Sequence, residues 1–271
     1  METGKARLVL PGLFVFIPRV SLLGEESRFR YTSQLPLTRR SLLLALPALV
    51  HASRTKTLCG VEFAVLRNGN GPRRYLFIHG NEDTARIVTA EHLKTHPGTG
   101  YAVTGKNRNV TVDGLLLDPN RMFSRIGAEK SLRNLNPSAP AEQVNGILDR
   151  LDREREPLLK LLTPGKGSRL VALHNNREYS VLDEVSASDA TSIKQPELPR
   201  SFFLCTDSKD FAVMKQSPYN VILQNKPNPD DGSLSRLAAR RGFRYINLEC
   251  ALGEQAAQVE RVNWLEQHLE T

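Results

Sequence analysis

Cysteine is scarce in this sequence of 271 residues, which contains only Cys59, Cys205 and Cys250. Their spacing fits neither a CxxC redox pair nor a zinc knuckle, and an odd number argues against a disulfide scaffold. Cys205 and Cys250 lie in apolar runs, where cysteine acts as a small buried hydrophobic residue. With 40% hydrophobic residues, the chain is expected to fold around an ordinary apolar core.

Clustered positive charge with aromatic residues is also absent. The net charge is +8, but residues 1–53 hold seven Lys or Arg and only three Asp or Glu, so half of the excess lies there. No basic run is interleaved with aromatic residues, which make up 6% of the chain. This pattern is typical of a solvated surface, and we expect no nucleic-acid partner.

The sequence has no apolar run long enough for a stable transmembrane span. The stretch Leu42–Val50 is short, follows the pair Arg39-Arg40 and precedes the small residues of Val50-His51-Ala52. This arrangement resembles a twin-arginine export signal, which predicts the twin-arginine export machinery as a partner and a periplasmic or secreted location. The alternative is a buried amphipathic helix that begins with two arginines. We therefore expect residues 1–53 to form an export signal with an upstream extension, and residues 54–271 a catalytic domain.

From about residue 57, apolar strand-like runs alternate with helical segments. Such alternation predicts a three-layer α/β/α sandwich with a mostly parallel mixed sheet. The expected strands are 61–67, 74–79, 101–104, 169–173, 202–205, 221–224 and 245–249. The expected helices are 83–96, 141–162, 208–215, 233–241 and 253–269, and Pro157 is expected to kink or split the second of them.

Four residues with metal or acid–base chemistry stand at or just after the ends of expected strands. His79 and Glu82, in His79-Gly80-Asn81-Glu82, follow one apolar run, His174 closes a second, and Glu249 closes a third. Ligands collect at the carboxyl ends of parallel strands, and two His with one Glu form a usual first shell for catalytic zinc. His79, Glu82 and His174 are therefore the expected ligands of one Zn²⁺ per chain.

Several segments resemble the succinylglutamate desuccinylase and aspartoacylase group of zinc carboxypeptidase-like hydrolases. The similar segments are His79-Gly80-Asn81-Glu82, Leu117-Asp118-Pro119-Asn120-Arg121-Met122-Phe123, Leu173-His174-Asn175 and the approach to Glu249. Their order agrees with the family, and the resemblance covers about residues 74–269. It implies a zinc hydrolase in which Asn120 and Arg121 hold a substrate carboxylate.

Charge and chemistry suggest the other roles. Glu249 is expected to be the general base, and Arg108 is the candidate cation for the developing oxyanion, with Lys106 a weaker one. Each residue has a structural alternative: Asn120-Arg121 could be a surface turn, Arg108 a solvated loop residue, and Glu249 a helix cap.

The sequence departs from the family at three points. Ala172 stands where a polar or acidic residue often precedes the third ligand, and Tyr219 is only a weak counterpart of the mobile tyrosine of carboxypeptidases. The chain ends soon after Glu249, without the carboxy-terminal β-domain that narrows the site in aspartoacylases. We therefore expect an open cleft for a peptide or acyl-amino-acid substrate.

The sequence thus predicts an exported zinc-dependent hydrolase that cleaves an amide bond next to a free carboxylate. A carboxypeptidase or an N-acyl-amino-acid amidase fits, with cell-wall peptides as one possible substrate. The alternatives are an esterase or deacylase with the same metal centre, and a non-catalytic binding module with the same fold. His92, His96 and His268 fall on helices or at their ends and are expected at the surface.

Overall fold

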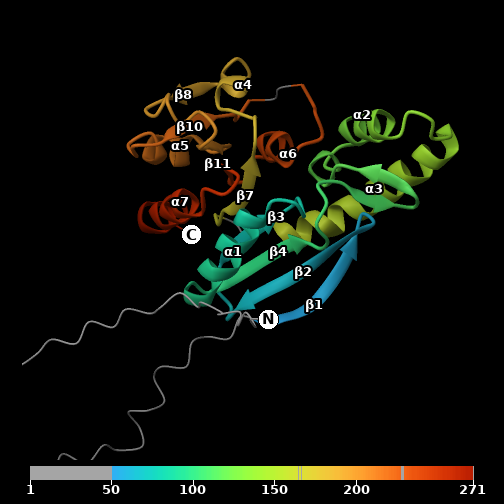
Figure 1. Cartoon of the computed structure of the whole chain (residues 1–271), viewed down its shortest axis with the longest axis horizontal. Helices are drawn as coiled ribbons and strands as arrows, with labels where there is room; N and C mark the ends of the chain where they lie inside the picture. Colours follow the sequence, from blue (N-terminus) through green and yellow to red (C-terminus); the bar gives the residue numbers. More distant parts are fainter. Residues whose placement is uncertain (1–50, 164, 166, 227–228, 271) are drawn as a thin grey trace, which may run out of the picture. The chain divides into compact units, whose positions relative to one another are not determined.

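A mixed sheet runs through the protein (Figure 1). The computed structural model describes residues 51–163, 165, 167–226 and 229–270, which all belong to one compact unit. Within these residues the sheet has nine strands in the order β1-β2-β4-β3-β7-β11-β9-β10-β8. Their bounds are β1 (His51–Leu58), β2 (Val61–Asn68), β3 (Arg73–Phe77), β4 (Gly98–Val103), β7 (Leu170–Asn176), β8 (Ala190–Ser192), β9 (Phe202–Cys205), β10 (Asn220–Leu223) and β11 (Tyr245–Ala251).

The centre of this sheet is parallel. Strands β4, β3, β7 and β11 run in one direction as direct neighbours, and β9 and β10 form another parallel pair. Antiparallel pairs lie on both flanks, namely β1–β2, β2–β4, β11–β9 and β10–β8. The expected mixed α/β class is confirmed, and the parallel part is the part that carries the predicted site.

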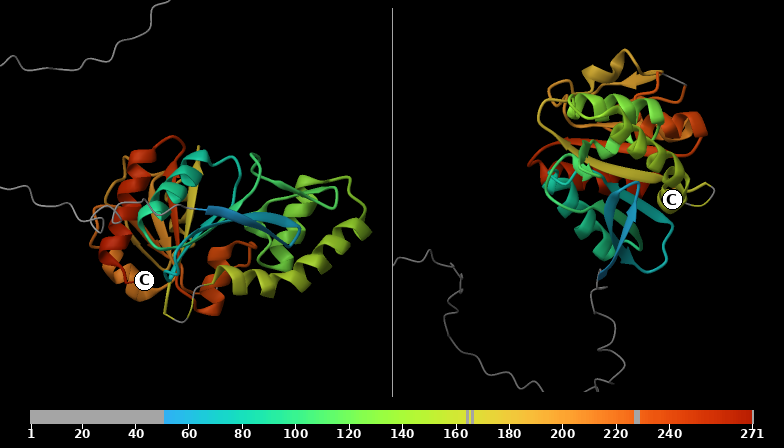
Figure 2. Two further views of the ribbon diagram at one scale, coloured as in Figure 1. Left: turned by 90° about the horizontal axis from the view of Figure 1, so that it is seen from below. Right: turned by 90° about the vertical axis from the view of Figure 1, so that its right-hand side faces the viewer.

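Helices cover both faces of the sheet and complete three layers (Figure 2). The side chains of β7 alternate between the two faces of the sheet. Val171 and Leu173 pack on one face, whereas Leu170 and Ala172 pack on the other. The first side is covered by α1 (Asp83–Thr95), α5 (Ser208–Met214) and α7 (Gln255–His268). The second is covered by α3 (Ala141–Leu162) and α6 (Leu234–Arg241), and α2 (Arg125–Leu135) packs against α3.

Local sequence signals set the helix ends. Ser233 caps α6 by accepting a hydrogen bond from the backbone N–H of Arg236, and Gly242 ends the helix with a φ of 67°. Helix α3 buries a stripe of Val, Ile and Leu and continues through Pro157 as a single element. The proline therefore does not split the helix, since tertiary packing on this stripe offsets the lost backbone hydrogen bond.

Some elements carry too little periodic signal to be predicted. These are β1, β8, the short helix α4 (Leu182–Val185), helix α2, and a hairpin of β5 (Val110–Val112) and β6 (Leu115–Leu117). The hairpin turns at Asp113-Gly114, both with positive φ, which is a common turn for two short strands. With α2 and α3 this hairpin forms a lobe that extends from the sheet (Figure 2). No described helix is long and apolar enough to cross a membrane.

The predicted export signal lies almost entirely outside the described residues. Strand β1 begins at His51, so the last two residues of the predicted cleavage motif Val50-His51-Ala52 belong to this strand.

Candidate metal centre

His79, Glu82 and His174 come together in the structure. Their ligand atoms lie within 4.8 Å of one another, and all three side chains are buried. His79 follows β3, Glu82 occupies the cap position of α1, and His174 lies on β7. Strands β3 and β7 are parallel neighbours, so their carboxyl ends meet at the same edge of the sheet. The predicted cluster is present and can hold one metal ion.

Gly80 is required in the bend between His79 and Glu82 because another loop approaches closely. A Cβ atom at this position would lie 2.8 Å from the carbonyl oxygen of Gly105 and 2.9 Å from that of Asn107. Gly80 is not among the glycines with positive φ, so its backbone angle does not explain the requirement. The close approach holds the loop that carries Arg108 against the metal cluster.

The donor atoms face one another as metal ligands do. Nδ1 of His79 lies 2.7 Å from one Glu82 carboxylate oxygen, and Nδ1 of His174 lies 3.3 Å from the other. Among the described residues, Glu82 Oε2 is a buried oxygen without a hydrogen-bond partner of good geometry. Two nitrogens and a carboxylate that converge on a buried point are a donor set that suits zinc.

Asp118 orients the first histidine. Its Oδ1 atom lies 2.9 Å from His79 Nε2, the ring nitrogen that faces away from Glu82. The same oxygen caps the short 3-10 helix η1 (Pro119–Arg121) by accepting a hydrogen bond from the backbone N–H of Asn120. A carboxylate on the second ring nitrogen fixes the tautomer and orientation of a metal-binding histidine. The sequence contained Asp118 in a recognised segment but gave no sign of this contact.

The charge of Glu82 depends on those of the two neighbouring histidines. Burial favours the neutral form of Glu82, but the neighbouring His174 and His79 outweigh it and lower the pKa of Glu82 to about 2. Burial also opposes protonation of His79, yet hydrogen bonds to Asp118 and Glu82 raise the pKa of this histidine. The cluster therefore stabilises positive charge at its centre, which a divalent cation can supply in place of protons.

The third ligand is supported from the α7 side. Gln258 donates a hydrogen bond of 3.0 Å to the backbone oxygen of His174 and accepts one from Asn175. Asn175 also accepts the backbone N–H of Ala85 in α1. Ala172 packs in the apolar layer on the other side of the sheet, so these amides, and not residue 172, support His174.

Glu249 lies directly beside the cluster. Strands β7 and β11 pair in parallel with Glu249 opposite His174. The two carboxylate oxygens accept hydrogen bonds from the side-chain amides of Asn176, at 3.0 Å, and Asn247, at 3.2 Å. Both asparagines lie two residues from His174 or Glu249, so the strand alternation turns all four side chains to one face. Within the described chain, Glu249 has no ion-pair partner and remains available for acid–base chemistry.

Arg108 also lies at the cluster. Its guanidinium group is 3.6 Å from Glu82 Oε1 and 3.3 Å from Asp118 Oδ2. About half of the side chain is exposed, so one face of the group can meet a ligand. Lys106, the weaker candidate, does not line the pocket described below.

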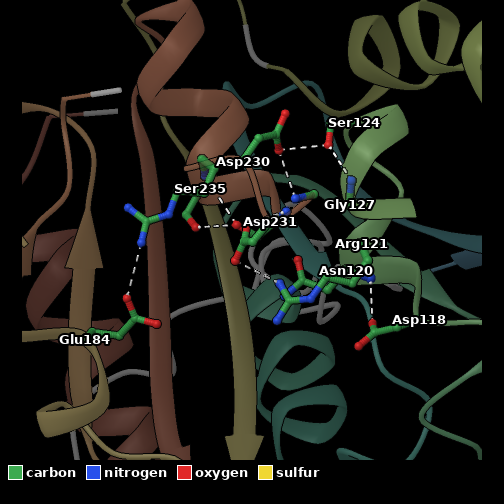
Figure 3. Close-up of polar contacts among 12 residues, drawn as sticks. Asp118, Asn120, Arg121, Ser124, Gly127, Glu184, Asp230, Asp231 and Ser235 are labelled. Carbon is green, nitrogen blue, oxygen red and sulfur yellow. Dashed lines mark hydrogen bonds and ion pairs between the residues drawn. The ribbon is translucent and has the colours of Figure 1, made fainter. Parts of the chain in front are cut away.

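A single cavity of 420 Å³ joins these residues. All seven predicted residues line it: His79, Glu82, Arg108, Asn120, Arg121, His174 and Glu249. Figure 3 shows the wall around η1, where Asn120 and Arg121 face the segment that contains Asp230 and Asp231. On this wall Arg121 forms an ion pair of 3.3 Å with Asp231, and its side chain is 36% exposed.

Arg236 is a pocket residue that the sequence did not reveal. It lies in the first turn of α6, and its side chain is only 10% exposed. Its nearest acidic group is Glu184 at 3.7 Å, and its NH1 atom is buried without a partner among the described residues. A buried, incompletely paired guanidinium group in a cavity is suited to an anionic ligand. In the sequence Arg236 looks like an ordinary helix residue beside Arg240 and Arg241.

Two other expectations are wrong. Tyr219 does not line the cavity; it is buried beside α7 and donates a hydrogen bond of 2.7 Å to Glu260. Tyr179 is the tyrosine in the lining, where it donates a hydrogen bond to Glu184. His92 is buried rather than at the surface, because it packs edge-on against Tyr75 and lies 3.8 Å from Glu266.

The comparisons with known proteins found similarity to solved structures. No protein-family model matches the chain, and no curated protein matches it. Among solved structures, the apo form of the ectoine utilization protein EutE (DoeB) from Ruegeria pomeroyi is similar, with 16% sequence identity and a TM-score of 0.40. The match covers 76% of this chain and 60% of that protein, so the chain spans less than two thirds of that protein's length.

Proposed function

We propose that the protein is a zinc-dependent hydrolase that cleaves an amide bond next to a free carboxylate. The observation that carries this proposal is the position of Glu249, in register beside His174, at the edge of the His79–Glu82–His174 cluster. A metal site and an unpaired carboxylate in one cavity are the two groups that metal-assisted hydrolysis requires.

His79, Glu82 and His174 would hold the metal ion. The buried, unpartnered Glu82 oxygen and the two converging Nδ1 atoms fit this assignment. A zinc ion bound there would act as a Lewis acid for the scissile carbonyl and lower the pKa of water. Asp118 would keep His79 in the tautomer that presents Nδ1 to the metal.

Glu249 would take a proton from the attacking water and pass it to the leaving nitrogen. The hydrogen bonds that it accepts from two asparagine amides hold its carboxylate in place without neutralising its charge. Arg108 lies beside Glu82 and Asp118, and its exposed guanidinium edge would stabilise negative charge on the carbonyl oxygen.

Arg236 and Arg121 are two cations in the cavity lining that can bind the substrate carboxylate. Arg236 is the stronger candidate, since its NH1 atom is buried without a described partner whereas Arg121 is paired with Asp231. A guanidinium fork with free N–H groups forms short, charge-assisted hydrogen bonds with a carboxylate.

Arg236→Gln is expected to raise KM for an acidic substrate about tenfold to a hundredfold, which corresponds to the loss of a charged hydrogen bond of roughly 1.5–3 kcal/mol. The kcat value should change less, since the carboxylate is bound in both the ground and transition states. Steady-state kinetics with a free-acid substrate and its amidated analogue check this. Arg241→Gln, an exposed arginine on the same helix, is the control. Equal effects of Arg236→Gln on both substrates would contradict the role.

The proposed reaction is tested with purified full-length protein. Metal content is measured first, followed by hydrolysis of N-acyl amino acids and short peptides with a free or amidated carboxylate. Hydrolysis that depends on zinc and on the free carboxylate supports the proposal. Cleavage of esters but not of amides would favour an esterase, and stoichiometric metal without turnover would favour a binding module.

We also propose that the protein is exported by the twin-arginine route and meets cell-wall peptides. Arg39-Arg40, the apolar stretch Leu42–Val50 and the small residues that follow support this proposal. A fusion of residues 33–60 to a reporter should be exported, and replacing both arginines with lysine should block export. Export that survives the double replacement would refute the twin-arginine route.

A further inference from the structure

Asp231 occupies the position at Arg121 that an anionic ligand would take. Its Oδ2 atom lies 3.3 Å from the Arg121 guanidinium group, and its Oδ1 atom accepts the backbone N–H of Ser233 at 2.9 Å. Both Arg121 and Asp231 line the cavity, and their side chains are 36% and 48% exposed. The pair is therefore open to a ligand that enters the cavity.

Neighbouring residues fix the backbone on both sides of Asp231 (Figure 3). Asp230 accepts hydrogen bonds from the Ser124 hydroxyl, at 2.8 Å, and from the Gly232 backbone N–H, at 2.9 Å. The Gly232 carbonyl accepts the backbone N–H of Phe123 at 3.0 Å. The Asp231 carboxylate is thus presented by a segment that is tied to the start of α2.

Gly232 allows its own backbone to lie very close to the backbones of Arg121 and Gly127. Its φ is 80°, and a Cβ atom on it would lie 2.4 Å from the carbonyl oxygen of Arg121. A Cβ on Gly127 would lie 2.2 Å from the Gly232 Cα atom, so the two backbones touch without intervening side chains. Arg121 and Asp231 are consequently held at a short distance by the backbone on each side of the pair.

We propose that Asp231 is an internal counter-ion that competes with the carboxylate of a ligand for Arg121, and so sets how strongly the pocket binds anions. The proposal rests on the proposed function only in treating Arg121 as an anion contact. A carboxylate that reaches Arg121 must lie close to the fixed carboxylate of Asp231, and like charges side by side weaken binding. Arg236 has Glu184 3.7 Å from its NH2 atom, but no described residue competes at its NH1 atom.

Asp231→Asn tests the proposal because the expected result is tighter binding. A variant with a damaged fold would bind more weakly, so it could not give this result. Asparagine keeps the oxygen that accepts the Ser233 N–H and removes only the negative charge. Succinate is the probe, because it has two carboxylates and no hydrolysable bond. Isothermal titration of the full-length protein should show succinate binding about threefold to tenfold tighter in Asp231→Asn than in the wild type.

Two matched variants locate the effect. Asp149→Asn makes the same charge change at an Asp that pairs with Arg125 outside the cavity lining, and it should leave succinate affinity unchanged. Arg121→Gln should abolish the gain when it is combined with Asp231→Asn, because the freed cation is then absent. Raising the ionic strength should reduce the difference between the wild type and Asp231→Asn.

Unchanged or weaker succinate binding by a folded Asp231→Asn protein would overturn the proposal. A gain that persists in the Arg121→Gln background would also overturn it, since the effect would then arise elsewhere. Failure of both the wild type and Asp231→Asn to bind succinate would show that freeing Arg121 creates no anion site. These readouts need no turnover, so a protein without metal or hydrolase activity can refute the proposed function and still confirm this inference.

Discussion

Glu249→Gln is expected to lower kcat at least about 100-fold while the protein keeps its zinc. Proton transfer by a positioned carboxylate typically contributes 10²–10⁴-fold to rate, and glutamine cannot accept the proton. The structure should accommodate the change, because Asn176 and Asn247 each have a buried, unpartnered carbonyl oxygen. A rotated amide of either residue can accept the N–H groups of the new glutamine.

The matched control for this change is Glu178→Gln, an exposed position just beyond β7 that does not line the cavity. Steady-state assays with the best amide substrate measure kcat, and elemental analysis measures zinc in the same samples. A kcat for Glu249→Gln within threefold of the wild type would remove Glu249 from the mechanism. Loss of zinc in this variant would instead place Glu249 among the ligands.

His79→Ala is expected to reduce bound zinc from about one equivalent to near zero. The substitution removes one of three expected ligands and leaves the carboxylates of Glu82 and Asp118 without the histidine that both contact. Zinc added to the wild type should raise its Tm, because a ligand that binds only the folded state stabilises that state. His79→Ala should show no such rise.

An exposed histidine provides the comparison: His268→Ala should retain the full zinc content and the rise in Tm. Elemental analysis after dialysis against a weak chelator distinguishes the variants. Equal zinc in wild type and His79→Ala would show that the bound metal lies elsewhere in the molecule.

The predicted site residues could be found because they depend on short patterns. His79 and Glu82 are three residues apart at the end of an apolar run, and His174 and Glu249 end two other apolar runs. Strand ends are readable from sequence, and the parallel sheet then brings such ends to one edge. The three-layer fold was predictable for the same reason, since apolar runs mark the strands and striped segments mark the helices.

The residues that were missed depend on side-chain packing and on strand register. Arg236 is a candidate ligand-binding residue only because it is buried on α6 beside Glu184. The sequence does not indicate this burial, since Arg236 is one of three nearby arginines in a helix. Asn247 matters only because β7 and β11 pair with Glu249 opposite His174, a register that no local pattern specifies. Asp231 lies near Arg121 because the backbones of Gly127 and Gly232 are in contact, and hydrophobic periodicity does not predict such a contact.

The in-register pairing of β7 with β11 also bears on how the protein reaches its native state. His79 follows β3, whereas His174 and Glu249 lie on β7 and β11. The contacts of these three strands join distant parts of the chain, and such contacts form late because loop closure is costly. His79 and His174 are therefore expected to meet only once β3 and β7 have paired. If the cluster binds a metal ion, assembly of the central sheet and tight metal binding would be coupled, and the ion would stabilise the finished fold.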